Sequence, residues 1–394
     1  MREIYLDNAA TTRVLPKAAE TAADAMRVSY GNPSSLHHKG FEAEQYITDA
    51  RRSIANSLKV PEDTIIFTSG GTESNNMALL CGAEARKRLG NHIITTKIEH
   101  ASVYEPVIRL EELGYRVTFL PVDNNGIVHP DTLREALTDD TILVSIMAVN
   151  NEIGALEPIE ELAKIVHEHN PQTLFHTDAI QAYGKIPMYP KRMGIDLMSV
   201  SGHKLHAPKG TGFLYIREKL TLRPLLYGGG QQKDRRSGTE NVPGIAGLGV
   251  AVKEWFSDAV GRRKHLYEIK ERFVRSMESV PDAIVNGVFT GEGDLSETVL
   301  RTAPHIASVS FPGVRSEVLL HALEEKGVYV SSGSACSSNH PAISGTLKAI
   351  GVREDLLDST LRFSFSFETT EEEIDAAVEA LRELVPKHRR YKRS

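Results

Sequence analysis

Cysteine is scarce in this chain of 394 residues and occurs only at Cys81 and Cys336. Two cysteines this far apart in sequence exclude a disulfide-rich scaffold and a zinc ribbon, and they suit a reducing compartment. We therefore expect a cytoplasmic protein without a metal site.

Long hydrophobic runs are also missing. No stretch approaches the roughly 18 uninterrupted apolar residues of a membrane span, and residues 1–8 lack the apolar core of a signal peptide. The net charge of −6 gives no general reason to expect nucleic acid, because only residues 387–393 are locally basic. We interpret that tail as a solvated terminus, and we expect no membrane and no direct nucleic-acid contact.

The composition that remains is ordinary for a soluble protein, with 41% apolar and 25% charged residues. A chain of this length exceeds what one hydrophobic core usually serves, so we expect a large domain and a smaller one.

The first two thirds of the chain alternate between apolar strand-like runs and amphipathic helices. Strands are predicted at residues 4–6, 64–68, 92–96, 116–120, 141–147, 173–178, 197–200 and 212–216, and helices at 16–27, 40–58, 75–89, 102–113 and 159–169. Apolar strands without polar alternation, separated by helices, indicate an α/β fold with a mostly parallel sheet covered on both faces.

After about residue 255 the pattern changes to that of a smaller α+β domain. Helices are predicted at 262–279 and 316–326, strands at 307–311, 328–331 and 361–365, and a closing helix begins at a capping box formed by Thr370 and Glu373. We assign residues 15–256 to the large domain, and residues 1–14 and 257–394 to the small domain, which carries a mobile loop at about 331–342.

Polar residues follow several predicted strands of the large domain. Ligands of open parallel sheets bind beyond the carboxyl ends of the strands. The residues found there include a glycine turn at Gly71 that opens a helix, then His100, Asp178 and Lys204. Each has an ordinary explanation by itself, such as a turn, a helix cap or a solvated lysine. Together they match pyridoxal phosphate, which needs a lysine for its aldehyde, an anion for its ring nitrogen and N–H or hydroxyl donors for its phosphate.

The two cysteines differ in their surroundings. Cys336 lies in a polar loop that contains glycine, where burial is not expected, so a reactive thiol is the favoured interpretation. Cys81 lies inside an apolar helical run and is interpreted as a packing residue.

These motifs resemble the cysteine desulfurases of the NifS/IscS type, within the class V aminotransferases, and the resemblance runs essentially end to end. The segments that carry it are Tyr5–Thr12, Gly31–Ser35, Thr68–Asn76, Val149–Gly154, Ser201–Lys204, Arg236–Thr239 and Ser331–Cys336. The resemblance implies the fold type I of pyridoxal-phosphate-dependent transferases, a homodimer, and conversion of L-cysteine to L-alanine. Its sulfur would pass through a persulfide to an acceptor protein, for iron–sulfur cluster assembly or for tRNA or cofactor thiolation.

The resemblance also implies roles for individual residues. Lys204 would bond the cofactor, and Cys336 would take the sulfur. His100 would stack on the ring and assist proton transfer, with Lys204 or His100 moving the Cα proton. The other expected cofactor contacts are Asp178 at the ring nitrogen, Gln181 at the ring hydroxyl, Asn151, and Gly71, Thr72, Ser201, His203 and the neighbouring subunit's Thr239 around the phosphate. Asn151 and Arg362 would orient the substrate, Arg362 as a fork for its carboxylate.

Two alternatives remain open at this stage. The first is an aminotransferase or a selenocysteine lyase on the same scaffold, although an aminotransferase would not need a cysteine on a loop. The second is a non-catalytic sulfur carrier or scaffold subunit, which the presence of Lys204, Asp178, His100 and Cys336 together argues against.

Overall fold

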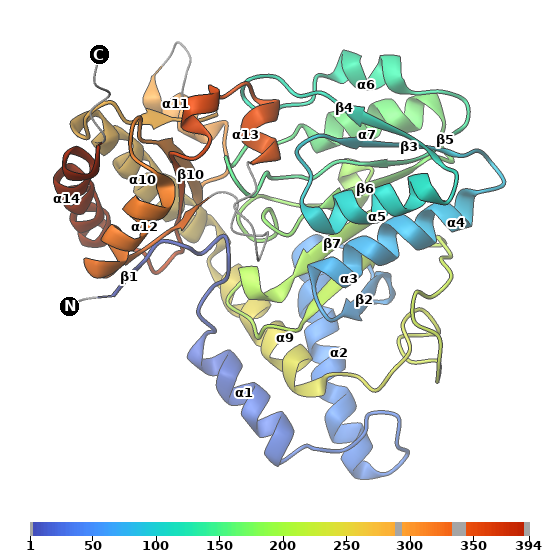
Figure 1. The fold of residues 1–394 in the computed structure, drawn as a ribbon. Coiled ribbons are helices and arrows are strands. Elements are labelled where there is room, and N and C mark those ends of the chain that lie inside the picture. The colour runs from blue at the N-terminus through green and yellow to red at the C-terminus, as the bar shows by residue number, and fades with distance from the viewer. Residues whose placement is uncertain (1–2, 288–293, 333–343, 390–394) are drawn as a thin grey trace.

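The structure is a computed structural model that describes residues 3–287, 294–332 and 344–389. Within these residues, no helix is both long enough and apolar enough to span a membrane. The chain forms one large sheet with helices on both faces and a smaller sheet beside it (Figure 1).

Within the part of the chain that the structure describes, the large sheet has seven strands in the order β2-β8-β7-β6-β5-β3-β4. All neighbouring pairs are parallel except those that involve β8, which runs antiparallel to both β2 and β7. The strands are β2 (Ile65–Thr68), β3 (His92–Thr96), β4 (Arg116–Leu120), β5 (Thr141–Ser145), β6 (Leu174–Asp178), β7 (Leu197–Ser201) and β8 (Gly212–Ile216). The predicted mostly parallel sheet is therefore confirmed.

Both faces of this sheet are buried, as the lack of polar alternation predicted. Consecutive residues of one strand point into different cores: Leu174 belongs to one apolar cluster and Phe175 to the other. The first cluster includes the helical segment at residues 71–86 and α5 (Ala101–Glu112), and the second includes α2 (His38–Leu58) and α7 (Ile159–His169). Cys81 is buried in the first cluster, which confirms its interpretation as a packing residue.

One predicted helix differs from the structure at its start. Instead of residues 75–89, it comprises α3 (Gly71–Asn76), a π-helical turn (Met77–Cys81) and α4 (Gly82–Arg86). The helix therefore begins at the glycine turn itself, directly after strand β2, which places its first N–H groups at the carboxyl edge of the sheet.

The structure also contains a long helix that the sequence analysis did not assign, α9 (Val242–Ser257). Its glycines and Pro243 are residue types that are typical of loops. In the structure, these glycines allow α9 to pack closely against α1 (Pro16–Arg27) and α2. A Cβ atom on Gly249 would lie 2.7 Å from the Cα of Ala50. Tertiary packing therefore outweighs the low helix propensity of glycine here.

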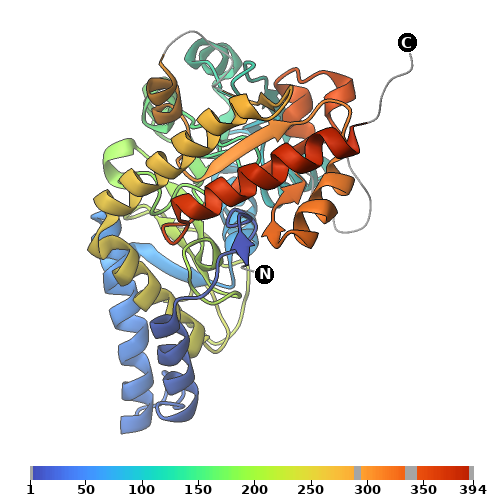
Figure 2. The same cartoon turned by 90° about the vertical axis from the view of Figure 1, so that its left-hand side faces the viewer.

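The small sheet is antiparallel, in the order β12-β13-β10-β9. Figure 2 shows α10 and α14, coloured gold and red, lying side by side against it. The elements of this part are β9 (Ile284–Val285), β10 (Ile306–Ser310), β12 (Ser331–Ser332), β13 (Thr360–Ser364), α10 (Ala259–Ser276), α12 (Ser316–Glu325) and α14 (Glu371–His388). The capping box of Thr370 and Glu373 at the start of α14 is confirmed.

The N-terminal segment runs between the two sheets. Strand β1 (Ile4–Tyr5) pairs in parallel with β11 (Val328–Tyr329), and Asp7 forms a bridge with Ser364 of β13. The chain then passes the carboxyl edge of the large sheet before it enters α1. The domain boundaries given above stay a prediction. Further short helices that were not assigned from the sequence are α6 (Pro130–Ala136), α8 (Pro190–Met193), α11 (Leu295–Leu300) and α13 (Gly345–Ala349).

Candidate active site

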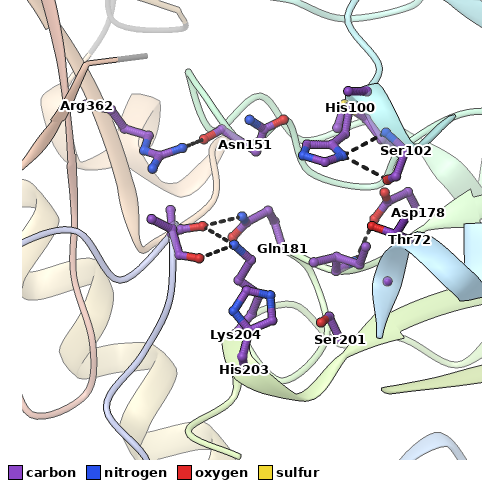
Figure 3. A pocket seen from close by; sticks show the side chains of 16 residues that line it. Thr72, His100, Ser102, Asn151, Asp178, Gln181, Ser201, His203, Lys204 and Arg362 are labelled. Carbon is purple, nitrogen blue, oxygen red and sulfur yellow. Dashed lines mark hydrogen bonds between the residues drawn. The ribbon is translucent and has the colours of Figure 1, made fainter. Parts of the chain in front are cut away.

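A pocket of about 350 Å³ lies at the carboxyl ends of the parallel strands (Figure 3). This volume is within the usual range for small-molecule sites. Of the predicted site residues that the structure describes, all except Thr239 line this pocket. The lining residues are Ala9, Ala10, Gly71, Thr72, His100, Ala101, Ser102, Met147, Asn151, Asp178, Ile180, Gln181, Ser201, His203, Lys204 and Arg362.

Lys204 enters the pocket from a short 3-10 turn (Gly202–Lys204) directly after β7. Its Nζ donates hydrogen bonds to the carbonyl oxygens of Ala9 at 2.7 Å and Ala10 at 2.6 Å. The N-terminal segment therefore fixes the position of the amine, which the sequence did not reveal. The buried Lys185 donates to the carbonyl oxygen of Lys204 at 2.5 Å and so holds the backbone of the turn.

Asp178, the last residue of β6, contributes a carboxylate to the lining of the pocket. It is only 4% exposed, and its carboxylate accepts hydrogen bonds from the Ile180 N–H at 2.9 Å and the Asn75 side-chain amide at 2.7 Å. Burial raises the pKa of this carboxyl above its usual value, because the charged form has lost its water. A cationic group bound beside Asp178 would favour the charged form.

His100 occupies the N-cap position of α5. Its Nδ1 accepts a hydrogen bond from the Ser102 backbone N–H at 3.1 Å and lies 2.8 Å from the Ser102 hydroxyl. The imidazole lies in the pocket with Ser102 on one side of it (Figure 3). Ser102 was not identified from the sequence, although its position two residues after a helix cap was a possible signal.

The start of the helical segment at residues 71–86 and the end of β7 form a cradle of hydrogen-bond donors. A Cβ atom on Gly71 would lie 2.1 Å from the Cδ1 of Ile180, so a side chain there would force Ile180 to move. Thr72 and Ser201 add hydroxyl groups. Burial, together with Lys204 and other nearby cations, lowers the pKa of His203 to about 4. His203 is therefore neutral at pH 7 and can donate one hydrogen bond.

Arg362 reaches the opposite side of the pocket from β13 of the small sheet. Its guanidinium donates to the backbone oxygen of Asn151 at 2.9 Å and to the carboxylate of Asp7 at 3.0 Å. Its buried Nε has no hydrogen-bond partner within the described part of the chain. A cationic fork that is held in place and retains donor capacity can bind a carboxylate.

Gln181 is held between two segments that are distant in sequence. Its side-chain N–H donates to the carbonyl oxygen of Ala9 at 2.9 Å, and its oxygen lies 3.1 Å from Nε2 of the buried His305. The carbonyl of Ala9 thus accepts hydrogen bonds from both Gln181 and Lys204, and it couples these two side chains.

Two predicted site residues remain. Cys336 lies outside the described residues, so its predicted role stays a prediction. Thr239 lines a different hollow together with Tyr30 and Asn32, at the end of α1.

The pocket fits pyridoxal phosphate on the chemistry of its side chains. It combines an amine on Lys204, a buried carboxylate on Asp178 and a cluster of N–H and hydroxyl donors at a helix start where Gly71 packs closely against Ile180. These are the groups that the aldehyde, the ring nitrogen and the phosphate of this cofactor require. Arg362 adds a site for the carboxylate of an amino acid.

The chain resembles known proteins over almost its entire length. The model of the family Aminotransferase class-V matches residues 4–377. The cysteine desulfurase IscS of Dictyoglomus turgidum is 43% identical over 98% of this chain and 96% of that protein. The putative cysteine desulfurase IscS 1 of Bacillus subtilis is 44% identical over 98% of this chain and 99% of that protein.

Solved structures show the same fold. A NifS-like protein superposes with a TM-score of 0.90 at 36% identity, covering 98% of this chain and all of that chain. A structure of SspA in complex with cysteine superposes with a TM-score of 0.78 at 32% identity, covering 94% of this chain and all of that one.

Proposed function

The chain belongs to the class-V aminotransferase family and has the type I fold of its pyridoxal-phosphate-dependent members; from this premise we propose that it is a cysteine desulfurase. One observation carries the proposal. Lys204, Asp178, His100 and Arg362 converge on one pocket from segments far apart in sequence. Relatives that are 43% and 44% identical are named cysteine desulfurases, and a related structure holds cysteine.

The residues of the pocket have separate roles in the reaction of L-cysteine. Arg362 binds the substrate carboxylate, and Asn151 helps to orient it. The bound cofactor supplies an electron sink that acidifies the Cα–H bond of the substrate. Lys204 moves the proton at Cα, because its amine lines the pocket and can accept a proton when it is neutral. Asp178 keeps the ring nitrogen protonated, and Gly71, Thr72, Ser201, His203 and the partner subunit's Thr239 hold the phosphate.

Cys336 takes the sulfur. Its thiolate attacks the substrate sulfur, a new S–S bond forms on Cys336, and the C–S bond breaks with its electron pair remaining on carbon. The carbon fragment then takes up one proton at Cβ, regains one at Cα from Lys204, and leaves as L-alanine. The described residues on both sides of this segment support the assignment: Ser331 pairs with Arg362, and Ser344 donates to Glu152, next to Asn151, at 2.5 Å.

We further propose that the enzyme acts as a cytoplasmic homodimer that passes its sulfur to an acceptor protein, for iron–sulfur cluster assembly or for tRNA or cofactor thiolation. The side chain of Tyr30, which is 70% exposed and lines the same hollow as Thr239, supports the dimer. A reactive thiol at Cys336 also requires a reducing compartment.

The test compares the substitution Cys336→Ser with the matched control Cys81→Ser. We expect Cys336→Ser to retain cofactor absorbance but to form no persulfide and to release no sulfide from L-cysteine. Cys81→Ser should retain persulfide formation, because Cys81 is buried in the apolar core and burial raises the pKa of its thiol to about 11.

Persulfide is measured by mass spectrometry of the intact protein, and alanine by amino-acid analysis. Normal sulfur transfer by the Cys336→Ser protein would refute the role of this cysteine. Release of an oxo acid in place of alanine would instead identify an aminotransferase.

A further inference from the structure

We propose that Asn75 and Ser102 are positioning residues that hold His100 in the tautomer with its proton on Nε2. His100 then acts toward the pocket as a hydrogen-bond donor and not as a base. Neither Asn75 nor Ser102 was assigned a role above. The inference deepens the proposed function and rests on it for its catalytic meaning, whereas the tautomer itself can be measured independently.

The first constraint on His100 comes from its position at the start of α5. The backbone N–H of Ser102 points at Nδ1 at 3.1 Å, and a backbone N–H can only donate. Nδ1 must therefore offer a lone pair. A proton on Nδ1 would face this N–H and would remove the cap of the helix.

The second constraint comes from the Ser102 hydroxyl, which lies 2.8 Å from the same Nδ1. Either atom of this contact could donate by itself, but Nδ1 offers its lone pair to the Ser102 backbone N–H and carries no proton to give, so the hydroxyl is the donor. The side-chain amide of Asn75 donates from its Nδ2 to Ser102 Oγ at 2.9 Å. That contact occupies a lone pair of the hydroxyl oxygen and leaves the hydroxyl proton for Nδ1.

The orientation of the Asn75 amide is fixed in turn by Asp178. The Asn75 Nδ2 donates to the Asp178 carboxylate at 2.7 Å, and an ionised carboxylate can only accept. Asn75 is fully buried, so its two N–H bonds have no competing water. A chain of hydrogen bonds therefore runs from Asp178 through Asn75 and Ser102 to His100, and every direction in it follows from Asp178 and the helix cap.

This chain of hydrogen bonds distinguishes between Lys204 and His100, the two candidate bases for the Cα proton. Nδ1 of His100 accepts two hydrogen bonds, so the single proton of the neutral ring is on Nε2. The ring then has no basic nitrogen facing the pocket, whereas it can donate from Nε2 to a substrate or cofactor atom. Lys204 is therefore the group that removes the Cα proton, and His100 supplies a hydrogen bond.

The test measures the tautomer in the holoenzyme labelled with ¹⁵N-histidine. The nitrogen chemical shifts of His100 distinguish a protonated nitrogen from an unprotonated one, and the His100→Gln protein identifies its signals by their loss. We expect an unprotonated Nδ1 and a protonated Nε2 at neutral pH. A protonated Nδ1 in the wild-type enzyme would overturn the proposal.

Substitutions at Ser102 separate positioning from general stability. Ser102→Ala removes the hydroxyl donor and keeps the backbone N–H, and Ser102→Thr keeps both. We expect Ser102→Ala to shift the ratio of the two tautomers toward Nδ1–H by roughly three- to tenfold, the equivalent of one hydrogen bond, and Ser102→Thr to retain the wild-type ratio. An unchanged ratio in Ser102→Ala would show that Ser102 does not position His100.

The outcome is separable from that of the proposed function. The chemical shifts can be read whether or not the enzyme releases sulfide from cysteine. A correct tautomer without desulfurase activity would refute the proposed function alone, and activity with a protonated Nδ1 would refute the positioning role alone.

Discussion

The substitution Asp178→Asn tests the central electrostatic feature of the pocket. It removes the negative charge from a side chain that is 4% exposed and that accepts hydrogen bonds from Asn75 and Ile180. The amide that replaces the carboxylate has a similar shape, one acceptor oxygen and no charge. It can no longer act as the anion for a protonated ring nitrogen.

The size of the effect follows from the hydrogen bond that is lost. A hydrogen bond to a charged group contributes about 1.5–3 kcal/mol, so we expect pyridoxal phosphate to bind roughly 10- to 150-fold more weakly to Asp178→Asn. The fold itself should change little in stability. Burial already raises the pKa of Asp178, so its charged form is costly in the protein without cofactor.

The affinity for pyridoxal phosphate should depend on pH in a definite direction. Cofactor binding needs the ionised carboxylate, so wild-type affinity should fall as pH drops through the raised pKa of Asp178. Asp178→Asn has no proton to take up at this position, so its affinity should lack this decline.

The assay is cofactor binding to the apoprotein, followed by absorbance between pH 5 and pH 8. The matched control is Asp196→Asn, a buried carboxylate before the start of β7 that accepts from the Phe175 N–H at 2.7 Å and pairs with Arg217. This control should lower stability and leave cofactor affinity intact. Equal affinity in wild type and Asp178→Asn would refute the reasoning.

Two further substitutions test the carboxylate site and a buried acid. Arg362→Lys keeps the positive charge but loses the forked guanidinium that can bind a carboxylate with two hydrogen bonds. KM for L-cysteine should therefore rise roughly 10- to 100-fold with unchanged cofactor absorbance. An unchanged KM in steady-state kinetics would contradict this role. Burial raises the pKa of Glu157 to about 8, so the native state takes up a proton at pH 7 and is destabilised there, whereas this penalty vanishes near pH 4. Glu157→Gln retains an acceptor for the Val128 N–H and should raise the free energy of unfolding by up to about 3 kcal/mol at pH 7 but not at pH 4. Equal urea-unfolding curves at pH 7 would contradict this.

The large sheet and most residues of the pocket could be predicted from the sequence. Apolar strands bounded by turns marked the positions of β3, β4 and β8 to the residue, because strands buried on both faces leave a simple pattern. The residues after the strands could then be assigned to one edge of the sheet, since parallel strands end together. Lys204, Asp178 and His100 were found in this way. Helix α9 was missed because its glycines serve packing against distant helices, which a local pattern does not record.

The contacts that hold these side chains in place come from residues far away in the sequence. The carbonyls of Ala9 and Ala10 that fix Lys204 lie almost two hundred positions away from it in sequence, and Arg362 meets Asp7 over a still longer separation. The chain from Asp178 through Asn75 and Ser102 to His100 likewise joins three separate segments. The physical reason is that a sequence shows which groups can donate and accept, whereas burial and distance decide which of them meet. The chemical identity of the pocket side chains predicted the cofactor. The directions of the hydrogen bonds from Asp178 to His100 assign Lys204 as the base.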